Sequence, residues 1–167
     1  MEEHREYVLR ALRENDAEAA AALVRTAFAA QGVATDPPPS ALRETAASVA
    51  ASLAAPGQGG IGAWAGAMLA GCVIWQVQER GLYLGRLSVH PAWRGRGIAP
   101  ALIAALEEVA RAHGLPRLLL STRLVLAGNR RLFARCGFAE VAQHAHPGYA
   151  HPTFVDMEKP VAASSHG

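Results

Sequence analysis

The sequence predicts an α/β or α+β domain in which helices pack on a sheet of mixed strand direction, and three observations support this class. The chain has 167 residues, which is the size of one domain. Hydrophobic residues make up 51% and charged residues 18%, a composition that excludes disorder over the whole chain. Strand and helix patterns are mixed along the chain, and the last two strands are consecutive. We expect one domain over residues 1–160 and a flexible tail over 161–167.

The first half of the chain carries two predicted helices and four predicted strands. Alanine-rich stretches at 17–31 and 40–55 favour helix, and Asn15 and Asp16 are suited to cap the first of them. The glycines at 57–60 predict a turn. Apolar, β-prone runs predict strands at 7–10, 62–64, 70–78 and 82–89.

The second half repeats this mixture. Apolar residues recur at helical spacing over 100–113, with Gly114 placed to end the helix. A shorter helix is predicted at 128–135, ending at Gly137. Strands are predicted at 118–122, 138–144 and 153–159.

Charge narrows the classes of partner. The net charge of +2 is too small to indicate nucleic-acid binding. Of the 16 basic residues 15 are arginines, and eight of these fall between Arg94 and Arg135. The arginine guanidinium can donate two parallel hydrogen bonds to phosphate, so this local excess suits a small phosphorylated ligand. A solvated surface has the same pattern.

Cysteine use and hydropathy indicate the compartment. Cys72 and Cys136 lie in apolar patterns, which predicts two reduced core thiols with neither a disulfide nor a metal site. No apolar run approaches the roughly 20 residues of a membrane span. The chain starts with polar and acidic residues at 1–6, unlike a signal peptide. We therefore expect a cytoplasmic protein without a membrane partner.

The most informative segment is 87–99, where a predicted strand, a loop with Gly95 and Gly97, and a helix follow one another. N–H groups at a helix N-terminus form a preformed anion site. Glycine removes the side chain that would hold an oxyanion away from the main chain. Pro100 suits the first helical turn, because its missing N–H would have no partner there in any case.

Three other interpretations of this loop compete. A dinucleotide-binding fingerprint would need glycine where Pro100 stands. The fragment Arg94–Gly97 resembles RNA-binding repeats, but it occurs once and inside an apolar domain. A tight strand-to-helix turn without a ligand explains the two glycines equally well.

Two elements of the sequence resemble the GNAT N-acetyltransferase superfamily. The acetyl-CoA signature Gln/Arg-x-x-Gly-x-Gly/Ala is matched by Arg94, Gly97 and Ala99, and Val89-His90-Pro91 precedes it as in the family. The stretch 129–138 resembles the family element Asn-x-x-Leu-Tyr-x-x-x-Gly-Phe. The resemblance implies a central, mostly antiparallel sheet with a splayed parallel strand pair, flanked by helices. It also implies acetyl-CoA as acyl donor. His144, His146 and His151 could together ligate a metal, but no carboxylate or cysteine accompanies them, so we expect no metal.

The resemblance assigns roles to individual residues. The strand before the loop would hold the pantetheine arm, and the Val89 N–H would donate to the oxyanion of a tetrahedral intermediate. The loop would wrap the pyrophosphate, while Asn129, which is equally suited to cap a helix, would contact the cofactor. The residues expected to bind the cofactor are Leu87, Ser88, Val89, Arg94, Gly95, Arg96, Gly97, Ile98, Ala99, Asn129 and Phe133.

The sequence leaves the acid and the base of the reaction open. The family commonly protonates the departing sulfur with a tyrosine, and this chain has Phe133 at that position. Ser88, Thr122, Tyr149 and water are substitutes, or the thiolate leaves unassisted. Glu44, Glu79 and Tyr83 are candidate bases by residue type, and each is also compatible with a surface role.

The acceptor is left open as well. The histidine-rich loop between the last two strands commonly borders the acceptor pocket in this superfamily, so His146, Tyr149 and His151 are candidates to shape it. The expected partner is a small-molecule or peptide amine, with a second copy of the chain as a further candidate because dimers are frequent in the superfamily. The alternative functions are a non-catalytic acyl-CoA-binding module and a nucleic-acid-binding domain.

Overall fold

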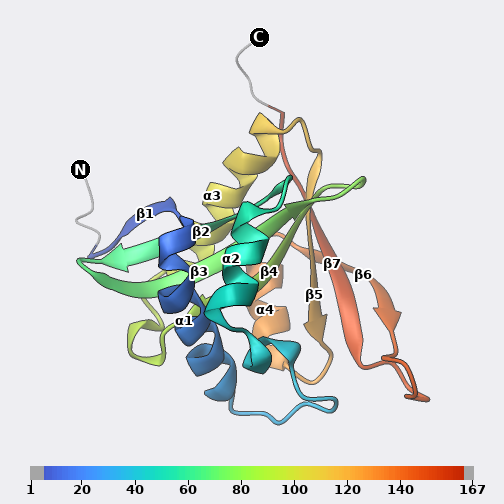
Figure 1. The fold of residues 1–167 in the computed structure, drawn as a ribbon. Helices are drawn as coiled ribbons and strands as arrows, with labels where there is room; N and C mark the ends of the chain where they lie inside the picture. The colour runs from blue at the N-terminus through green and yellow to red at the C-terminus, as the bar shows by residue number, and fades with distance from the viewer. Residues whose placement is uncertain (1–5, 164–167) are drawn as a thin grey trace.

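The computed structural model describes residues 6–163, and its centre is a seven-stranded sheet in the order β1-β2-β3-β4-β5-β7-β6 (Figure 1). Residues 1–5 and 164–167, which include parts of the predicted polar start and tail, lie outside the described residues. The strands are β1 (Val8–Ala11), β2 (Gln58–Ala65), β3 (Met68–Val77), β4 (Leu82–Val89), β5 (Arg117–Arg123), β6 (Ala139–His144) and β7 (Phe154–Pro160). The helices are α1 (Ala17–Ala29), α2 (Ala46–Ala54), α3 (Ile98–Ala112) and α4 (Ala127–Arg135), with single 3-10 turns at Glu14–Asp16, Ser40–Arg43 and Pro91–Trp93.

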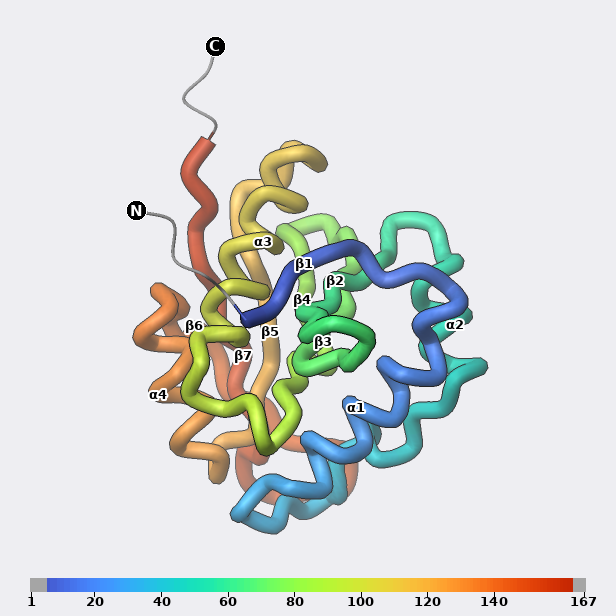
Figure 2. Tube along the Cα trace, turned by 90° about the vertical axis from the view of Figure 1, so that its left-hand side faces the viewer, coloured from blue at the N-terminus to red at the C-terminus, as the bar shows by residue number. Residues whose placement is uncertain are grey.

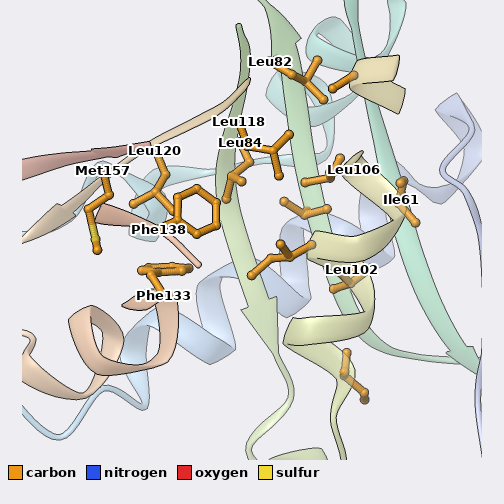
Figure 3. Close-up of a cluster of buried hydrophobic side chains, with 14 of the residues drawn as sticks. Ile61, Leu82, Leu84, Leu102, Leu106, Leu118, Leu120, Phe133, Phe138 and Met157 are labelled. Atoms are coloured by element: carbon orange, nitrogen blue, oxygen red, sulfur yellow. The ribbon is translucent and has the colours of Figure 1, made fainter. Parts of the chain in front are cut away.

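Helices cover both faces of the sheet. Helices α1 and α2 lie on one face and α3 and α4 on the other, as the view in Figure 2 makes clear. The larger core lies on the α3 side, where Leu102 and Leu106 of α3 pack with Leu82 and Leu118 of the central strands. Phe133 and Phe138 extend this core beside Leu120 (Figure 3). The predicted mixed sheet with flanking helices is confirmed.

Strands β4 and β5 form the one parallel pair of the described sheet and separate soon after they meet. Their pairing is limited to Leu82 with Leu118 and Tyr83 with Leu119. Every other neighbouring pair of strands is antiparallel. Since both strands continue well beyond these positions, they diverge into a gap on the side where β4 leads to the glycine loop (Figure 1).

A bulge in β4 contributes to this divergence. Cys72 of β3 faces Ser88, whereas Ile74 faces Gly85, so Arg86 and Leu87 together stand opposite Val73. Arg86 takes the left-handed conformation with φ +56°, an uncommon value for a residue with a side chain. Such a bulge bends the strand and disturbs its ladder, which turns β4 away from β5.

The structure corrects three predicted elements. The helix predicted at 40–55 is a 3-10 turn over Ser40–Arg43 followed by α2, because Thr45 and Ser48 form a capping box that starts the helix anew. The turn predicted at 57–60 is wrong beyond Gly57, since Gln58–Gly60 belong to β2 and pair with β3. Helix α3 starts at Ile98, ahead of the predicted Pro100.

The cysteines and the start of the predicted tail have defined surroundings. Cys72 and Cys136 are free thiols, and burial raises the pKa of the Cys72 thiol to about 12, so it stays protonated and unreactive. The Val161 N–H donates to the Pro116 carbonyl at 2.9 Å, and the Arg111 side chain donates to the Ala162 carbonyl at 2.8 Å. No helix among residues 6–163 is long and apolar enough to cross a membrane.

Candidate active site

A cavity of about 710 Å³ opens on the α1–α2 side of the gap between β4 and β5. Its walls come from four regions: the α1–α2 segment, strands β3 and β4, the far end of β5 with α4, and the β6–β7 loop. Three of the residues predicted to bind the cofactor, Leu87, Asn129 and Phe133, line it. The other apolar side chains of the wall include Phe28, Ile74, Trp75, Leu84, Leu126 and Phe154.

The main chain of β4 faces this gap. The His90 N–H donates to the Ala70 carbonyl at 2.8 Å, so Val89 and Gly71 form a non-hydrogen-bonded pair of the antiparallel ladder. In such a pair each residue turns its own N–H and C=O away from the partner strand. The Val89 N–H therefore points to the β5 side, where β5 has already diverged.

The glycine loop beyond β4 presents unoccupied donors. Gly95 and Gly97 have φ of +77° and +79°, so both positions favour glycine for conformational reasons. A Cβ on Gly95 would meet nothing within 4 Å, and one on Gly97 only the Tyr7 hydroxyl at 4.0 Å. Within residues 6–163, the N–H groups of 94–99 make no hydrogen bond of ordinary geometry with the main chain. The loop and the first turn of α3 thus present free main-chain donors of the kind that can bind an anion.

The two arginines of the loop differ in their surroundings. Arg96 pairs with Glu6, and its guanidinium lies 4.5 Å from the ring centroid of Trp93. Arg94 is exposed and makes no ion pair with a described residue. His90 has a structural role at the end of β4, since its Nδ1 accepts the Ala92 N–H at 3.1 Å. A phosphate would therefore meet Arg94 without competition, whereas Arg96 would have to leave Glu6 or share it.

Helix α4 brings Asn129 and Phe133 to the cavity. The helix starts at Ala127 with Leu126 before it, so Asn129 lies in the first turn and the helix-cap interpretation of this residue is wrong. Asn129 and Phe133 are four residues apart and therefore share one face of the helix, the face on the cavity. Phe133 is buried and its ring centroid is 5.8 Å from that of Phe138. Phe133 forms an apolar wall where the family has a proton donor.

The three candidate bases lie in two different cavities. Glu44 and Tyr83 line the cavity, whereas Glu79 lies in a second cavity of about 310 Å³ that touches the first at Tyr83, Leu120 and Ser121. The Glu44 carboxylate accepts the Ser48 hydroxyl at 3.0 Å and lies 3.5 Å from the Arg86 guanidinium.

The candidate acids differ in whether their side chains reach the cavity. Thr122 is buried in the cavity wall. Ser88 is 1% exposed and donates its hydroxyl to the Arg86 carbonyl at 2.9 Å, so its side chain does not reach the cavity. Tyr149 donates to Asp36 at 2.6 Å, which holds the β6–β7 loop against the α1–α2 segment.

Of the three histidines at 144, 146 and 151, His146 alone lines the cavity formed by the described residues. Its N–H donates to the Thr153 hydroxyl at 3.0 Å, and its ring centroid is 4.8 Å from that of Phe154. Burial and the nearby charge of Arg123 lower the pKa of His146, which favours its neutral form. His144 instead pairs with Asp156 at 2.7 Å. No group of three metal-ligating side chains occurs among residues 6–163.

Among the cavity residues that sequence reasoning missed are its two arginines, Arg86 and Arg123. Arg86 reaches it because the bulge turns its side chain toward Ser40, to which it donates at 3.0 Å. Arg123, the last residue of β5, donates to the Pro37 carbonyl at 2.6 Å. Neither position carries a local sequence signal, because each depends on a contact with the distant α1–α2 segment.

Comparison with known proteins agrees with this geometry. A model of the Acetyltransferase (GNAT) family matches residues 33–138, well over half of the chain. An IAA acetyltransferase from Azospirillum brasilense is 34% identical over 93 residues, which are 54% of this chain and 60% of that protein. The matches to curated relatives span between 24% and 60% of those proteins' own lengths.

Solved structures share the fold over most of their length. The ribosomal-protein-S18-alanine N-acetyltransferase of Escherichia coli superposes with a TM-score of 0.72 at 20% identity, covering 96% of this chain and 97% of that one. The PaiA N-acetyltransferase of Thermoplasma acidophilum, in complex with coenzyme A, gives 0.72 at 18% identity, covering 92% and 98%. With the family match, the diverging parallel strands and the open glycine loop, the chain belongs to the GNAT acetyltransferase family.

Proposed function

We propose that this protein is an N-acetyltransferase that moves the acetyl group of acetyl-CoA to a primary amine by direct attack. The observation that carries the proposal is the gap between β4 and β5, which has an outward-facing N–H at Val89 on one side and leads to the open anion site at Gly95–Ala99. A thioester with a diphosphate on a long arm matches both features. The coenzyme A held by the Thermoplasma acidophilum structure supports the same ligand here.

The cofactor-binding residues divide by the part of acetyl-CoA that they meet. The main chain of Leu87, Ser88 and Val89 pairs with the pantetheine arm as an added strand would. The N–H groups of Gly95, Arg96, Gly97, Ile98 and Ala99 bind the pyrophosphate, and Arg94 adds a charge-assisted contact. Asn129 contacts the arm from α4, and Phe133 packs against the sulfur.

The chemistry is one substitution at the acetyl carbonyl. The lone pair of the neutral amine attacks the carbonyl carbon, and the carbonyl oxygen takes up negative charge, which the Val89 N–H stabilises. The intermediate collapses with cleavage of the C–S bond, and the electron pair leaves with sulfur as the CoA thiolate. The proton lost by the amine passes to Glu44, to Tyr83 or to water in the cavity. No metal is needed for any of these steps.

The alternative is an acyl-CoA-binding module without catalysis, which is favoured by the lack of a proton donor at Phe133. Binding and turnover separate the possibilities. Acetyl-CoA at 100 times its dissociation constant is expected to stabilise the protein by about 2.7 kcal/mol, or about 5 to 11 °C in melting temperature. The absence of a shift contradicts both functions. With binding present, release of free thiol with a panel of amines indicates the enzyme, and its absence the module.

Replacing Phe133 by tyrosine is expected to raise kcat severalfold. A phenol at this position supplies the proton that the departing sulfur needs, and a positioned acid contributes up to about 10²–10⁴-fold where protonation limits the rate. Thiolate is already a fair leaving group, so the gain is smaller than that range. The measurement is steady-state thiol release at saturating acetyl-CoA.

The control for this substitution is Phe138→Tyr. Phe138 is also buried and packs on Phe133, but it does not line the cavity. A phenol there is expected to cost stability without raising kcat. Should both variants behave alike, or Phe133→Tyr leave kcat unchanged, another step or another acid governs turnover.

The setting of the enzyme is part of the proposal. Two free thiols without a disulfide support a reducing compartment, and we place the protein in the cytoplasm. The acceptor is a small-molecule or peptide amine, and a homodimer is the assembly proposed from the superfamily.

A further inference from the structure

The cavity of about 710 Å³ is lined by two arginines, Arg86 and Arg123, and by one carboxylate, Glu44. Arg86 is neutralised by Glu44, 3.5 Å away. Arg123 has no carboxylate within 4.0 Å among residues 6–163, and the one hydrogen bond of its side chain within that range is to the neutral Pro37 carbonyl. Of the two arginines that line the cavity, Arg123 is therefore the one without an ion-pair partner among the described residues.

The surroundings of Arg123 make this charge costly for the protein alone. The side chain is partly buried, and burial lowers the pKa of Arg123. Asp36 is close enough to act on that charge through space, but its Oδ1 atom already accepts the Tyr149 hydroxyl at 2.6 Å. A guanidinium has five N–H donors, and the Arg123 side chain uses one of them for the Pro37 carbonyl. The remaining donors can bind a carboxylate in a bidentate manner.

Arg123 lines the same cavity as Leu87, a residue of the part of β4 that is proposed to hold acetyl-CoA. In the parallel pair Tyr83 lies beside Leu119, and four residues further along each strand are Leu87 and Arg123. The bulge shortens β4 by about one residue, so Ser88 is also close to this level. The part of β4 that is proposed to hold the thioester and Arg123 thus lie at similar distances beyond the last paired residues and border one cavity. An acceptor with its amine at the thioester has room for a second group, a few bonds away, at Arg123.

We propose that the natural acceptor is an amine that also carries a carboxylate, as α-amino acids do, and that Arg123 binds this carboxylate. This inference rests on the proposed acetyltransferase function and narrows it to a substrate class. The apolar wall formed by Phe28, Leu84 and Phe154 faces the same cavity and suits an apolar side chain on the acceptor. Arg123 is a specificity residue that contacts the acceptor and takes no part in the transfer of the proton.

The test compares matched amines that differ in the carboxylate. L-Phenylalanine, L-leucine and L-methionine are each measured beside their carboxamides by thiol release from acetyl-CoA. The amide amine is less basic and more often unprotonated at neutral pH, so it would react faster if charge were not recognised. We expect kcat/KM to favour at least one acid over its amide by about tenfold or more.

Substitution of Arg123 locates the effect. Arg123→Gln is expected to abolish the preference by lowering kcat/KM for the acid about tenfold or more while leaving the amide nearly unchanged, and Arg123→Lys to restore part of it. The matched control is Arg117→Gln, because Arg117 also lies on β5 and donates to a main-chain carbonyl, that of Arg80 at 2.7 Å, but does not line the cavity. This control is expected to keep the preference.

A binding measurement keeps the two proposals apart. Titration of N-acetyl-L-phenylalanine and of its carboxamide into the protein with CoA reports carboxylate recognition without turnover. Normal acetyl-CoA stabilisation together with no carboxylate preference, in kinetics or in binding, overturns the assignment of Arg123 and leaves the acetyltransferase proposal standing. Equal loss of acid and amide in Arg123→Gln also overturns it, since that result shows a purely structural role. Failure to bind acetyl-CoA counts against the function itself.

Discussion

Replacement of Gly97 by valine is expected to raise the dissociation constant of acetyl-CoA by roughly 100-fold or more. The Cβ of residue 97 points into open space at the anion site, 4.0 Å from the Tyr7 hydroxyl, so the new side chain stands where the phosphates approach. Losing two charge-assisted hydrogen bonds, each worth about 1.5–3 kcal/mol, is sufficient for a change of this size. Isothermal titration with acetyl-CoA measures it directly.

The control for this substitution addresses backbone strain. Valine is disfavoured at φ +79°, which costs roughly 1–2 kcal/mol of stability wherever it occurs. Gly66→Val imposes the same kind of strain in the β2–β3 turn, at φ +62° and with nothing within 4 Å of its Cβ. We expect similar losses of melting temperature in both variants and normal acetyl-CoA affinity in Gly66→Val alone. Normal affinity in Gly97→Val would mean that the pyrophosphate site lies elsewhere.

Replacement of Gly81 by alanine is expected to destabilise the protein by about 2 to 3 kcal/mol. A Cβ on Gly81 would lie 2.5 Å from the Arg117 carbonyl oxygen and 2.7 Å from the Arg117 Cγ atom. The first of these is main chain, which cannot rotate away. Gly81 directly precedes Leu82 and Tyr83, the two residues through which β4 pairs with β5, so relief of the clash separates the two halves of the sheet where they are joined.

Thermal and denaturant unfolding measure this effect, and the expected loss corresponds to about 4 to 12 °C in melting temperature. Gly128→Ala is the matched control, and it is expected to raise the stability of the protein. Its Cβ would meet nothing within 4 Å, and the residue lies in helix α4, where alanine is favoured over glycine by about 1 kcal/mol. A melting temperature for Gly81→Ala equal to that of the unmodified protein would show that the strands tolerate a wider junction than this geometry indicates.

The elements predicted from sequence are mostly those with strong local patterns. The apolar periodicity of Leu102 and Leu106 identified helix α3, and the β-prone runs identified β3 and β4. The errors occur where a local signal points to the wrong structure. The glycines at 59 and 60 resemble a turn, but the space beside β2 is taken by Trp75 and Leu12, so only glycine fits a strand there. The alanine-rich segment from Ser40 continues a helical pattern, but the capping box at Thr45 starts α2 separately.

The candidate site divides in the same way. The glycine loop could be predicted because strand, glycines and helix are consecutive and each has its own signal. Phe133 and Asn129 could be predicted because the resemblance covers them. Arg86 and Arg123 could not, since a bulge and a contact to Pro37 bring them to the cavity from separate parts of the chain.

The sequence by itself determined the mixed sheet with its helices and the order of strand, glycine loop and helix at 87–99, because hydrophobic periodicity and glycine act over a few consecutive residues. The family was indicated by the resemblance of the motifs at 89–99 and 129–138. Only the tertiary structure decided how β4 and β5 diverge, which side chains line the cavity between them, and which of its arginines lacks an ion pair among the described residues. These properties depend on contacts between residues such as Arg123 and Pro37, 86 positions apart, and no local pattern encodes the approach of two distant segments.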